Sequence, residues 1–322
     1  MKENIVPKWQ RELRSFVGIK SGIILEGNVY DEFPYFSYDG EQPVFEDVDD
    51  LDTTLVSLFD QNVTAVFFFD PVDGFYCEDD VEQQKKRLAV LLEGYTSKET
   101  MRKNGTRACV MPTAKEKGGR RGNAEETEQY IWVSEIIRDA MANKARLTDK
   151  ESLIFVVNFA SRLDACNLRE AEANTMFLNL MAATTALQTG ATVGNTLILV
   201  VDKYNDIPAW VYLNNPNIRT ISLCAPDRGV RRLYLQNLHG TLAEYQVLGD
   251  DENKAGKQFV AETEGLKLQE VRQILQLANR MSIPPEMMHL AFRLYKYGVS
   301  DDPWENLEND ILTDIEATLE TR

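Results

Sequence analysis

Five short apolar runs recur along the chain, and each is rich in β-branched or aromatic residues. They lie at residues 22–25, 63–69, 153–157, 196–201 and 218–223. None of them alternates cleanly between apolar and polar positions, so both faces of each predicted strand are expected to be buried. This pattern is typical of parallel strands in a sheet that helices cover on both sides.

Segments with helical spacing of apolar residues lie before and between these runs. They cover residues 6–17, 51–59, 125–142 and 170–187. Strands that alternate with helices in this way predict an α/β domain with three layers, in which the five strands form one parallel sheet.

The strand pattern stops after Pro226 and Asp227, and helical patterns follow over residues 228–238 and 268–281. A last helix begins at Pro284 and Pro285, which suit a first helical turn. We therefore expect three parts in the chain. They are an α/β domain over residues 1–240, a small all-helical domain over residues 241–299, and an acidic helix or linker over residues 300–322.

The composition indicates a soluble protein of the cytoplasm. The 51 acidic residues outnumber the 35 basic ones, for a net charge of −16, which argues against wholesale wrapping of nucleic acid or of an anionic membrane. No apolar run approaches the ~20 residues that a membrane helix needs, and the N-terminus has no signal core. The four cysteines form no CxxC pair, so we expect reduced, buried thiols and no metal site. They are Cys77, Cys109, Cys166 and Cys224.

Charge is distributed unevenly along the chain. Residues 26–52 contain ten acids and no base, whereas residues 98–122 contain eight bases and two acids. The basic segment could bind nucleic acid or an acidic partner, or it could be a solvated loop that balances the acidic surface. Its candidate contact residues are Arg107, Lys115, Lys117, Arg120 and Arg121.

The order of strands and helices resembles the AAA+ family of ring-forming P-loop ATPases. Residues 196–235 resemble the sensor-1 strand, the next helix and the fifth strand, which the family often closes with Pro-Asp, as Pro226-Asp227 does here. Residues 259–278 resemble the helical lid, including its Thr-Glu-Gly turn. The resemblance implies a three-layer αβα P-loop-NTPase-like domain followed by the helical lid.

The residues that handle ATP in this family are replaced. No GxxxxGK[ST] motif occurs, although such glycines, lysine and hydroxyl are what cradle phosphates and Mg²⁺. Gly27 and Asn28 stand at the end of the first strand, either as the remnant of a phosphate cradle or as a simple strand-ending turn. Asp31 then adds negative charge where the triphosphate would lie.

The later catalytic positions are replaced as well. Asn158 and Phe159 align with the Walker B acids, which hold Mg²⁺ and orient the attacking water. The sensor-1 position falls at Asp202 or Lys203, and Arg219 is the base nearest to the arginine-finger position, which makes it an interface candidate. The resemblance therefore implies a degenerate nucleotide site with no bound cofactor.

Three functions are consistent with these observations. The first is a catalytically degenerate AAA+-like module, similar to the inactive first module of tandem AAA+ proteins. It would act in the assembly or regulation of a larger AAA+ complex without hydrolysing ATP itself, with AAA+ subunits or an active AAA+ module as partners in a homo- or hetero-oligomer. The second is a divergent ATPase whose site, with ATP and Mg²⁺, is completed by another subunit. The third is a clamp-loader-like nucleic-acid-binding module that uses the basic segment of residues 98–122.

Overall fold

The chain folds into two units of different architecture, Met1–Ala225 and Pro226–Arg322. The computed structural model describes residues 5–39, 42–60, 63–78, 82–92, 102–104, 107–110, 126–142, 152–163, 170–185 and 194–298. The helices of the first unit are α1 (Lys8–Phe16), α2 (Leu51–Ser57), α3 (Glu82–Leu92), α4 (Glu126–Ala142), η2 (Ala160–Arg162), α5 (Glu170–Thr185), η3 (Tyr204–Asp206) and α6 (Ala209–Tyr212). Its strands are β1 (Gly22–Gly27), β2 (Phe33–Asp39), β3 (Gln42–Asp49), β4 (Thr64–Asp70), β5 (Gly74–Glu78), β6 (Arg102–Asn104), β7 (Arg107–Val110), β8 (Ser152–Val157), β9 (Thr196–Val201) and β10 (Ile218–Leu223).

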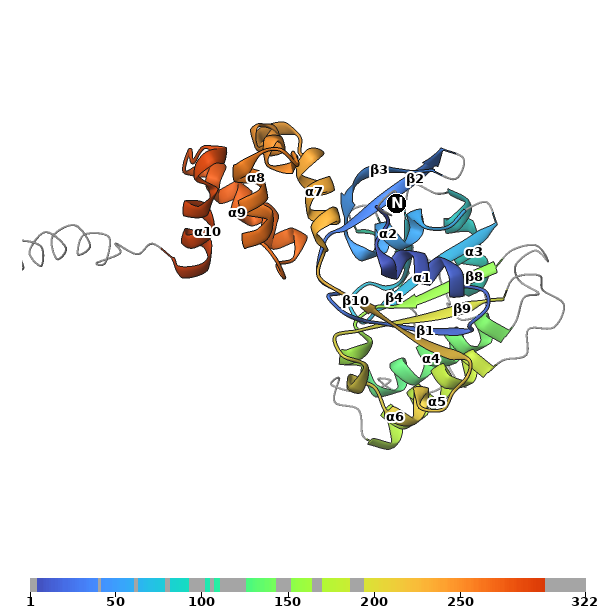
Figure 1. Ribbon diagram of the computed structural model, residues 1–322. Coiled ribbons are helices and arrows are strands. Elements are labelled where there is room, and N and C mark those ends of the chain that lie inside the picture. Colours follow the sequence, from blue (N-terminus) through green and yellow to red (C-terminus); the bar gives the residue numbers. More distant parts are fainter. Residues whose placement is uncertain are drawn as a thin grey trace, which may run out of the picture. The chain divides into compact units, whose positions relative to one another are not determined.

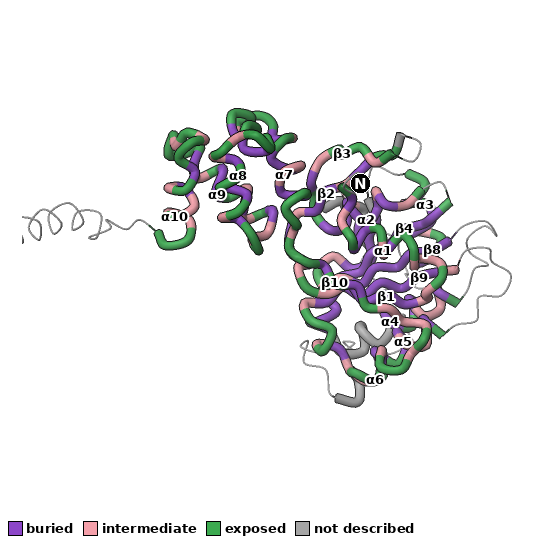
Figure 2. Tube along the Cα trace, viewed as in Figure 1, coloured by how far each residue is buried: buried purple, intermediate pink, exposed green. Residues whose placement is uncertain are grey.

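A sheet with the strand order β10-β1-β9-β8-β4-β5-β7-β6 forms the centre of the first unit (Figure 1). Its first five strands pair in parallel, and they are the five apolar runs of the sequence. Strands β4, β8 and β9 are buried at every position, because their residues contact helices on both faces (Figure 2). The predicted five-stranded parallel sheet is confirmed.

Helices cover this sheet on both faces, so the three predicted layers are confirmed. On one face, the apolar sides of α1 and α2 pack on alternate strand residues such as Ile23, Phe68 and Val156. On the other face, α3, α4, α5 and α6 cover the neighbouring residues, including Phe67 and Phe155. This division follows from the two-residue period of a strand, which sends successive side chains to opposite faces.

Two strand arrangements were not predicted from the sequence. First, β1 is followed by the antiparallel hairpin β2–β3, which leads into α2 through the helix cap Asp50. Second, β4 turns back into β5, β5 pairs with β7, and β7 pairs with β6, all in antiparallel fashion at one end of the sheet. Both additions place new side chains beside the ends of the parallel strands.

The second unit is all-helical, as expected. It contains α7 (Arg228–Gln236), η4 (Gly240–Gly249), α8 (Lys254–Glu262), α9 (Leu268–Arg280), η5 (Pro285–Met287) and α10 (Met288–Tyr297). Helix α7 packs against η4 and α8, and so it belongs to this unit, whereas the sequence-based boundary at residue 240 would separate it. Gly256 allows the close approach of α8 and η4, because an added Cβ would lie 2.4 Å from the carbonyl oxygen of Leu248.

Three further expectations concern the described parts of the chain. Cys77 and Cys109 are buried as predicted, but Cys224 is exposed, because it follows the edge strand β10, which is buried only in part. None of the helices within the described ranges is both long and apolar enough to span a membrane. The predicted acidic helix of residues 300–322 and Cys166 lie outside these ranges.

Candidate functional site at the carboxyl edge of the sheet

The carboxyl ends of the parallel strands meet at one edge of the sheet, which we call the carboxyl edge. In open α/β sheets this edge is where ligands bind. Gly27 ends β1, Asn158 and Phe159 follow β8, and Asp202 and Lys203 follow β9. The structure thus brings all the residues predicted for the degenerate nucleotide site, including Asn28 and Asp31, to the same edge.

The chain after β1 forms a tight turn that continues into a strand. Gly27 has φ +104°, and its backbone is so close to β10 that an added Cβ would lie 3.0 Å from the carbonyl oxygen of Leu223. The Asn28 side chain donates to Asp31 Oδ2 at 2.6 Å, and the backbone N–H of Glu32 donates to Asp31 Oδ1 at 2.8 Å. Asp31 is buried in this turn, and β2 begins two residues later, at Phe33.

Asn158 points into a buried polar cluster. Its amide nitrogen Nδ2 donates to Asp52 Oδ1 at 2.7 Å and to the hydroxyl of Tyr76 at 2.8 Å. The Tyr76 hydroxyl donates in turn to Asp52 Oδ2 at 2.8 Å, and Arg107 Nη2 lies 2.9 Å from the same oxygen. We call these four residues the buried cluster. It joins α2, β5, β7 and the end of β8, which are distant in sequence.

Burial and the neighbouring groups act in opposite directions on the pKa of Asp52. Burial raises the pKa of Asp52 from 3.8 to about 6, although Arg107, Asn158 and Tyr76 all favour the ionised form. Burial, with the charge of Asp52, raises the pKa of Tyr76, so its hydroxyl stays protonated and can donate. Arg107 also lies over the Tyr76 ring, with its guanidinium carbon 4.8 Å from the ring centroid, and contacts Asp50 and Asp73. The polar groups of the cluster are thus hydrogen-bonded to or ion-paired with one another.

Phe159, the next residue in the chain, turns outward. Its backbone has φ 54°, a left-handed conformation that costs a bulky residue roughly 1–2 kcal/mol. The residue is 40% exposed, and its ring stacks on the ring of Tyr30, a residue that is 50% exposed, with the two centroids 6.2 Å apart. Strained residues of this kind cluster at functional sites. The stacked pair therefore marks an exposed face of the carboxyl edge.

Asp202 joins this exposed face to the end of β9. Its carboxylate Oδ2 lies 2.7 Å from Arg162 Nη2, and its backbone N–H donates to Ser161 Oγ at 2.7 Å. Burial, followed by a hydrogen bond to Asp202, raises the pKa of Tyr30. Lys203 only begins the turn η3, where its backbone N–H donates to Asp206 Oδ2 at 3.0 Å.

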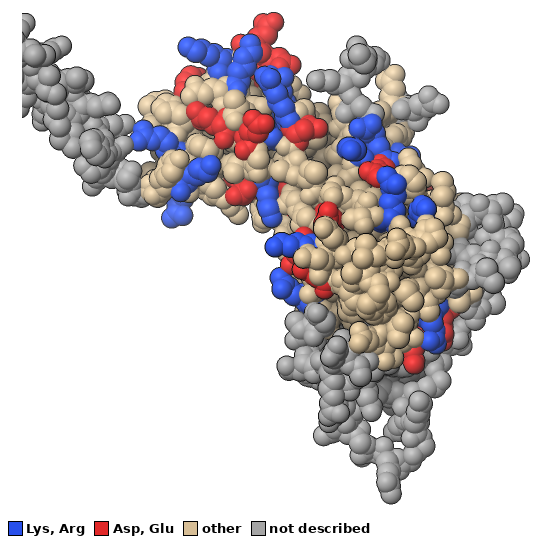
Figure 3. All heavy atoms as spheres, turned by 60° about the horizontal axis from the view of Figure 1, so that its bottom comes forward, with Lys and Arg blue, Asp and Glu red and all other residues tan. Residues whose placement is uncertain are grey.

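The remaining predicted residues lie elsewhere. Arg219 on β10 donates to Glu12 on α1, with Nε 2.8 Å from Oε1, and its guanidinium stacks 3.9 Å from the centroid of the Phe16 ring. Arg107, assigned from sequence to the basic loop, lies on β7 in the buried cluster. Lys115, Lys117, Arg120 and Arg121 lie outside the described residues. Figure 3 shows bases and acids interspersed over the helical unit, with no basic stripe on the described surface in that view.

Sequence reasoning missed four residues of the carboxyl edge: Asp52, Tyr76, Tyr30 and Arg162. Asp52 ends the acidic stretch of residues 26–52, and Arg107 falls in the basic segment, so a pairing of the two oppositely charged segments was a signal that could have linked them. Tyr76 could not be found in this way, because its role depends on the unpredicted strand β5.

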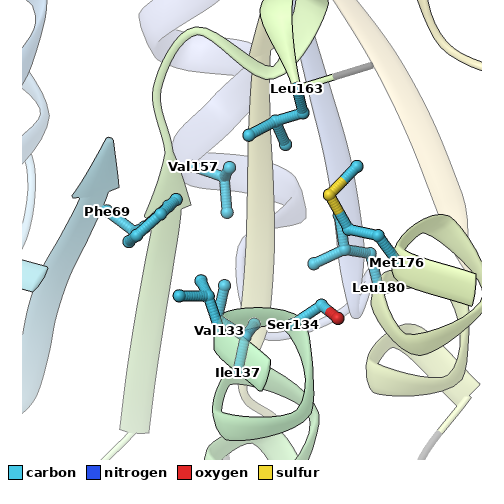
Figure 4. A pocket seen from close by; sticks show the side chains of 8 residues that line it. All are labelled: Phe69, Val133, Ser134, Ile137, Val157, Leu163, Met176 and Leu180. Carbon is cyan, nitrogen blue, oxygen red and sulfur yellow. The ribbon is translucent and has the colours of Figure 1, made fainter. Parts of the chain in front are cut away.

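A small apolar pocket lies between the sheet and helices α4 and α5, beside this edge (Figure 4). Its side chains point toward one another, and its volume is ≈ 10 Å³, about the space of one water molecule. It is lined by Phe69, Val133, Ser134, Ile137, Val157, Leu163, Met176 and Leu180. It is too small to hold a nucleotide. Within the described ranges, no group of three or more His, Cys, Asp or Glu side chains could hold a metal ion.

Comparison with known proteins identifies a family. Residues 2–223 match the family model described as "AAA+ chaperone, N-terminal Rossmann-like domain". Among solved structures, a complex titled "Structure of E. coli MS115-1 HORMA:CdnC:Trip13 complex" contains a similar chain, with a TM-score of 0.45 and 10% sequence identity over 90% of this chain and 77% of that one. No curated protein matches the sequence.

Proposed function

The chain belongs to the family of AAA+ chaperones with an N-terminal Rossmann-like domain, and on this premise we propose that it is a non-hydrolysing cytoplasmic module. It acts by assembling with AAA+ subunits or with an active AAA+ module, in a homo- or hetero-oligomer. The family description supports this role, since it names an N-terminal domain of proteins that are AAA+ chaperones.

The observation that carries the proposal is the connection after β1. A phosphate cradle needs a glycine-rich loop whose backbone N–H groups continue into the N-terminus of a helix. Here the turn of residues 28–32 leads into β2, and Asp31 occupies its interior. Two like charges about 4 Å apart repel by about 4 kcal/mol near a protein surface. The turn therefore fits a triphosphate poorly.

The end of β8 supports the same proposal. The amide nitrogen of Asn158 is already engaged by Asp52 and Tyr76, and Phe159 has no group that could orient water. ATP and Mg²⁺ thus lack suitable partners at both positions, and no hydrolytic step is assigned to these residues.

Titration of the purified chain with ATP–Mg²⁺ and with ADP tests the proposal. We expect no heat of binding and no change in melting temperature at millimolar nucleotide. Bound nucleotide at 100 times Kd would stabilise the fold by about 2.7 kcal/mol, which a thermal melt detects easily.

Saturable binding would contradict the proposal, and two variants would then locate the site. Asp31→Asn removes the negative charge inside the turn after β1, and Asp250→Asn removes an exposed charge in the helical unit. Tighter nucleotide binding in the first variant alone would place the nucleotide at the carboxyl edge, and the divergent ATPase would become the better description.

A further inference from the structure

Arg107 connects strand β7 to helix α2 across the intervening strand β5. Its guanidinium lies over the ring of Tyr76 on β5, and its Nη2 reaches Oδ2 of Asp52 on α2 at 2.9 Å. Strand β7 also pairs with β5 and β6 through its backbone. The ion pair is therefore a side-chain connection between this end of the sheet and the helices that cover it.

Three carboxylates lie near this guanidinium, and they differ in burial. Besides Asp52, Asp50 Oδ2 lies 3.4 Å from Nη2 and Asp73 Oδ2 lies 3.8 Å from Nη1. The side chain of Asp52 is 11% exposed, against 16% for Asp73 and 54% for Asp50. Burial disfavours a charged carboxylate, so of the three it acts most strongly on Asp52. Arg107 thus has two other carboxylates within reach when Asp52 is neutral.

A proton on Asp52 competes with Arg107 for the same oxygen. Oδ1 of Asp52 accepts from the Asn158 amide, and Oδ2 accepts from the Tyr76 hydroxyl and from Arg107. An amide nitrogen and a guanidinium can only donate, whereas a hydroxyl can also accept. A proton on Oδ2 therefore finds its acceptor in the Tyr76 hydroxyl, and it removes the negative charge with which Arg107 pairs.

The surroundings place this competition near neutral pH. Burial raises the pKa of Asp52 from 3.8 to about 6, although Arg107, Asn158 and Tyr76 act in the opposite direction. The folded chain therefore takes up the proton at a pH at which an unperturbed aspartate is ionised. The charged, titratable and hydrogen-bonding groups around Asp52 and Arg107 are Asp50 at the cap of α2, Asp70 at the end of β4, Asp73 in the turn that follows, Tyr76 on β5 and Asn158 after β8.

We propose that the buried cluster is a pH-sensitive latch, in which ionised Asp52 holds Arg107, and with it β7, against α2, and in which protonation of Asp52 releases Arg107 to Asp50 and Asp73. The new contacts hold β7 less tightly, because Asp50 is half-exposed and Asp73 is more distant. The same proton stabilises the fold as a whole, since the folded chain binds it more tightly than the unfolded chain does. A local loosening of β7 without a global loss of stability therefore distinguishes the latch from acid denaturation.

Amide hydrogen exchange of the full chain, followed by mass spectrometry at pH 7.5 and pH 5, tests the proposal. Rates divided by those of an unstructured chain at the same pH give protection factors. We expect the protection of β7 to fall by about tenfold at pH 5, which corresponds to about 1.4 kcal/mol. The protection of β9, a central strand that is buried at every position, should not fall.

Two variants should each abolish the pH dependence at β7. Asp52→Asn keeps the shape of the side chain but is neutral at both pH values, and Arg107→Met removes the cation. In both variants we expect the low protection of β7 at pH 7.5 as well as at pH 5, and either variant suffices if the other does not fold, which thermal melts establish. Glu12→Gln is the matched control, because it removes one acid from the more exposed ion pair with Arg219 and should leave the wild-type profile unchanged.

Three outcomes would overturn the proposal. Equal protection of β7 at both pH values in the wild type would show that Asp52 does not release Arg107. A joint loss of protection in β7 and β9 would indicate global destabilisation by acid. An undiminished pH dependence in Asp52→Asn would assign the titration to another carboxylate, such as Asp70 or Asp73.

Discussion

Asn158 and Phe159 are neighbours in the chain, yet they belong to opposite environments. Asn158 donates into the buried cluster, where Asp52, Tyr76 and Arg107 satisfy one another. Phe159 adopts a left-handed backbone conformation with φ 54° and is 40% exposed to solvent. At the end of β8, one residue therefore belongs to the buried hydrogen-bond network, and the next is exposed to solvent.

This difference bears on the proposal that the edge binds no nucleotide, although the same edge binds ligands in other α/β proteins. In the buried cluster, the polar groups use their hydrogen-bonding capacity on one another, so few are left for a ligand. Outside this cluster, the stacked rings of Tyr30 and Phe159 remain about half-exposed. The comparison predicts large effects on stability for substitutions in the buried cluster and small ones for substitutions of the exposed rings.

The largest expected effect comes from removing the charge partner of Asp52. Arg107→Met leaves a buried carboxylate without its cation, and we expect the free energy of unfolding to fall by about 2–4 kcal/mol at pH 7.5, since the arginine itself is partly exposed. Urea denaturation measures the loss. Arg219→Met is the control, because its ion pair with Glu12 is more exposed and is expected to contribute about 1 kcal/mol or less.

The next expected effect is a pH dependence of the free energy of unfolding, which comes from Asp52. Its pKa is about 6 in the folded chain and near 3.9 when unfolded, so the folded state binds the extra proton between these values. The stability that Asp52 contributes is thus greatest below pH 4 and is lost as the pH rises through 6, by about 3 kcal/mol at most.

Asp52→Asn should remove this dependence, because the amide does not titrate in this range. The difference in free energy of unfolding between wild type and variant, followed by urea denaturation from pH 4 to 7.5, measures it. A difference that stays constant over this range would show that the carboxylate is ionised throughout and that burial does not dominate its pKa.

The sequence was sufficient to predict the parallel core. The runs that became β4, β8 and β9 are buried on both faces, and such runs have few alternatives to an interior strand. The hairpin β2–β3 was missed because β3 mixes proline and acids with a half-exposed face. Strand β7 was missed because it is short and begins with Arg107, whose charge is stabilised only by tertiary contacts.

The candidate site was predictable only in part, and for a related reason. The residues at the ends of β1, β8 and β9 follow from strand order, so Asn28, Asn158 and Asp202 were placed at a common edge. Their partners come from other elements: Tyr76 from β5 and Arg107 from β7. Local pattern carries no information on such pairings, and the outward turn of Phe159 depends on a backbone angle that its residue type disfavours.

A smaller effect is expected at Asn158 itself. Asn158→Leu removes the donor shared by Asp52 and Tyr76, and we expect a loss of about 1–3 kcal/mol, because both acceptors then lose a buried partner. Urea denaturation of the single variant, of Tyr76→Phe and of the double variant gives their coupling. Strictly additive losses would mean that the two residues do not act as one network.

The smallest effect separates backbone strain from side-chain contact at Phe159. Both Phe159→Ala and Phe159→Gly remove the ring that stacks on Tyr30, but only glycine accepts φ 54° without steric cost. We expect the glycine variant to be more stable than the alanine variant by about 1 kcal/mol, and to lie within about 1 kcal/mol of wild type. Ala182→Gly near the C-terminal end of α5, where the backbone is helical, should instead destabilise the chain by roughly 0.5–1 kcal/mol. If Phe159→Gly is less stable than Phe159→Ala, just as Ala182→Gly is less stable than the wild-type alanine, the backbone at residue 159 is not strained. The exposure of the Phe159 ring would then not result from backbone strain at the end of β8.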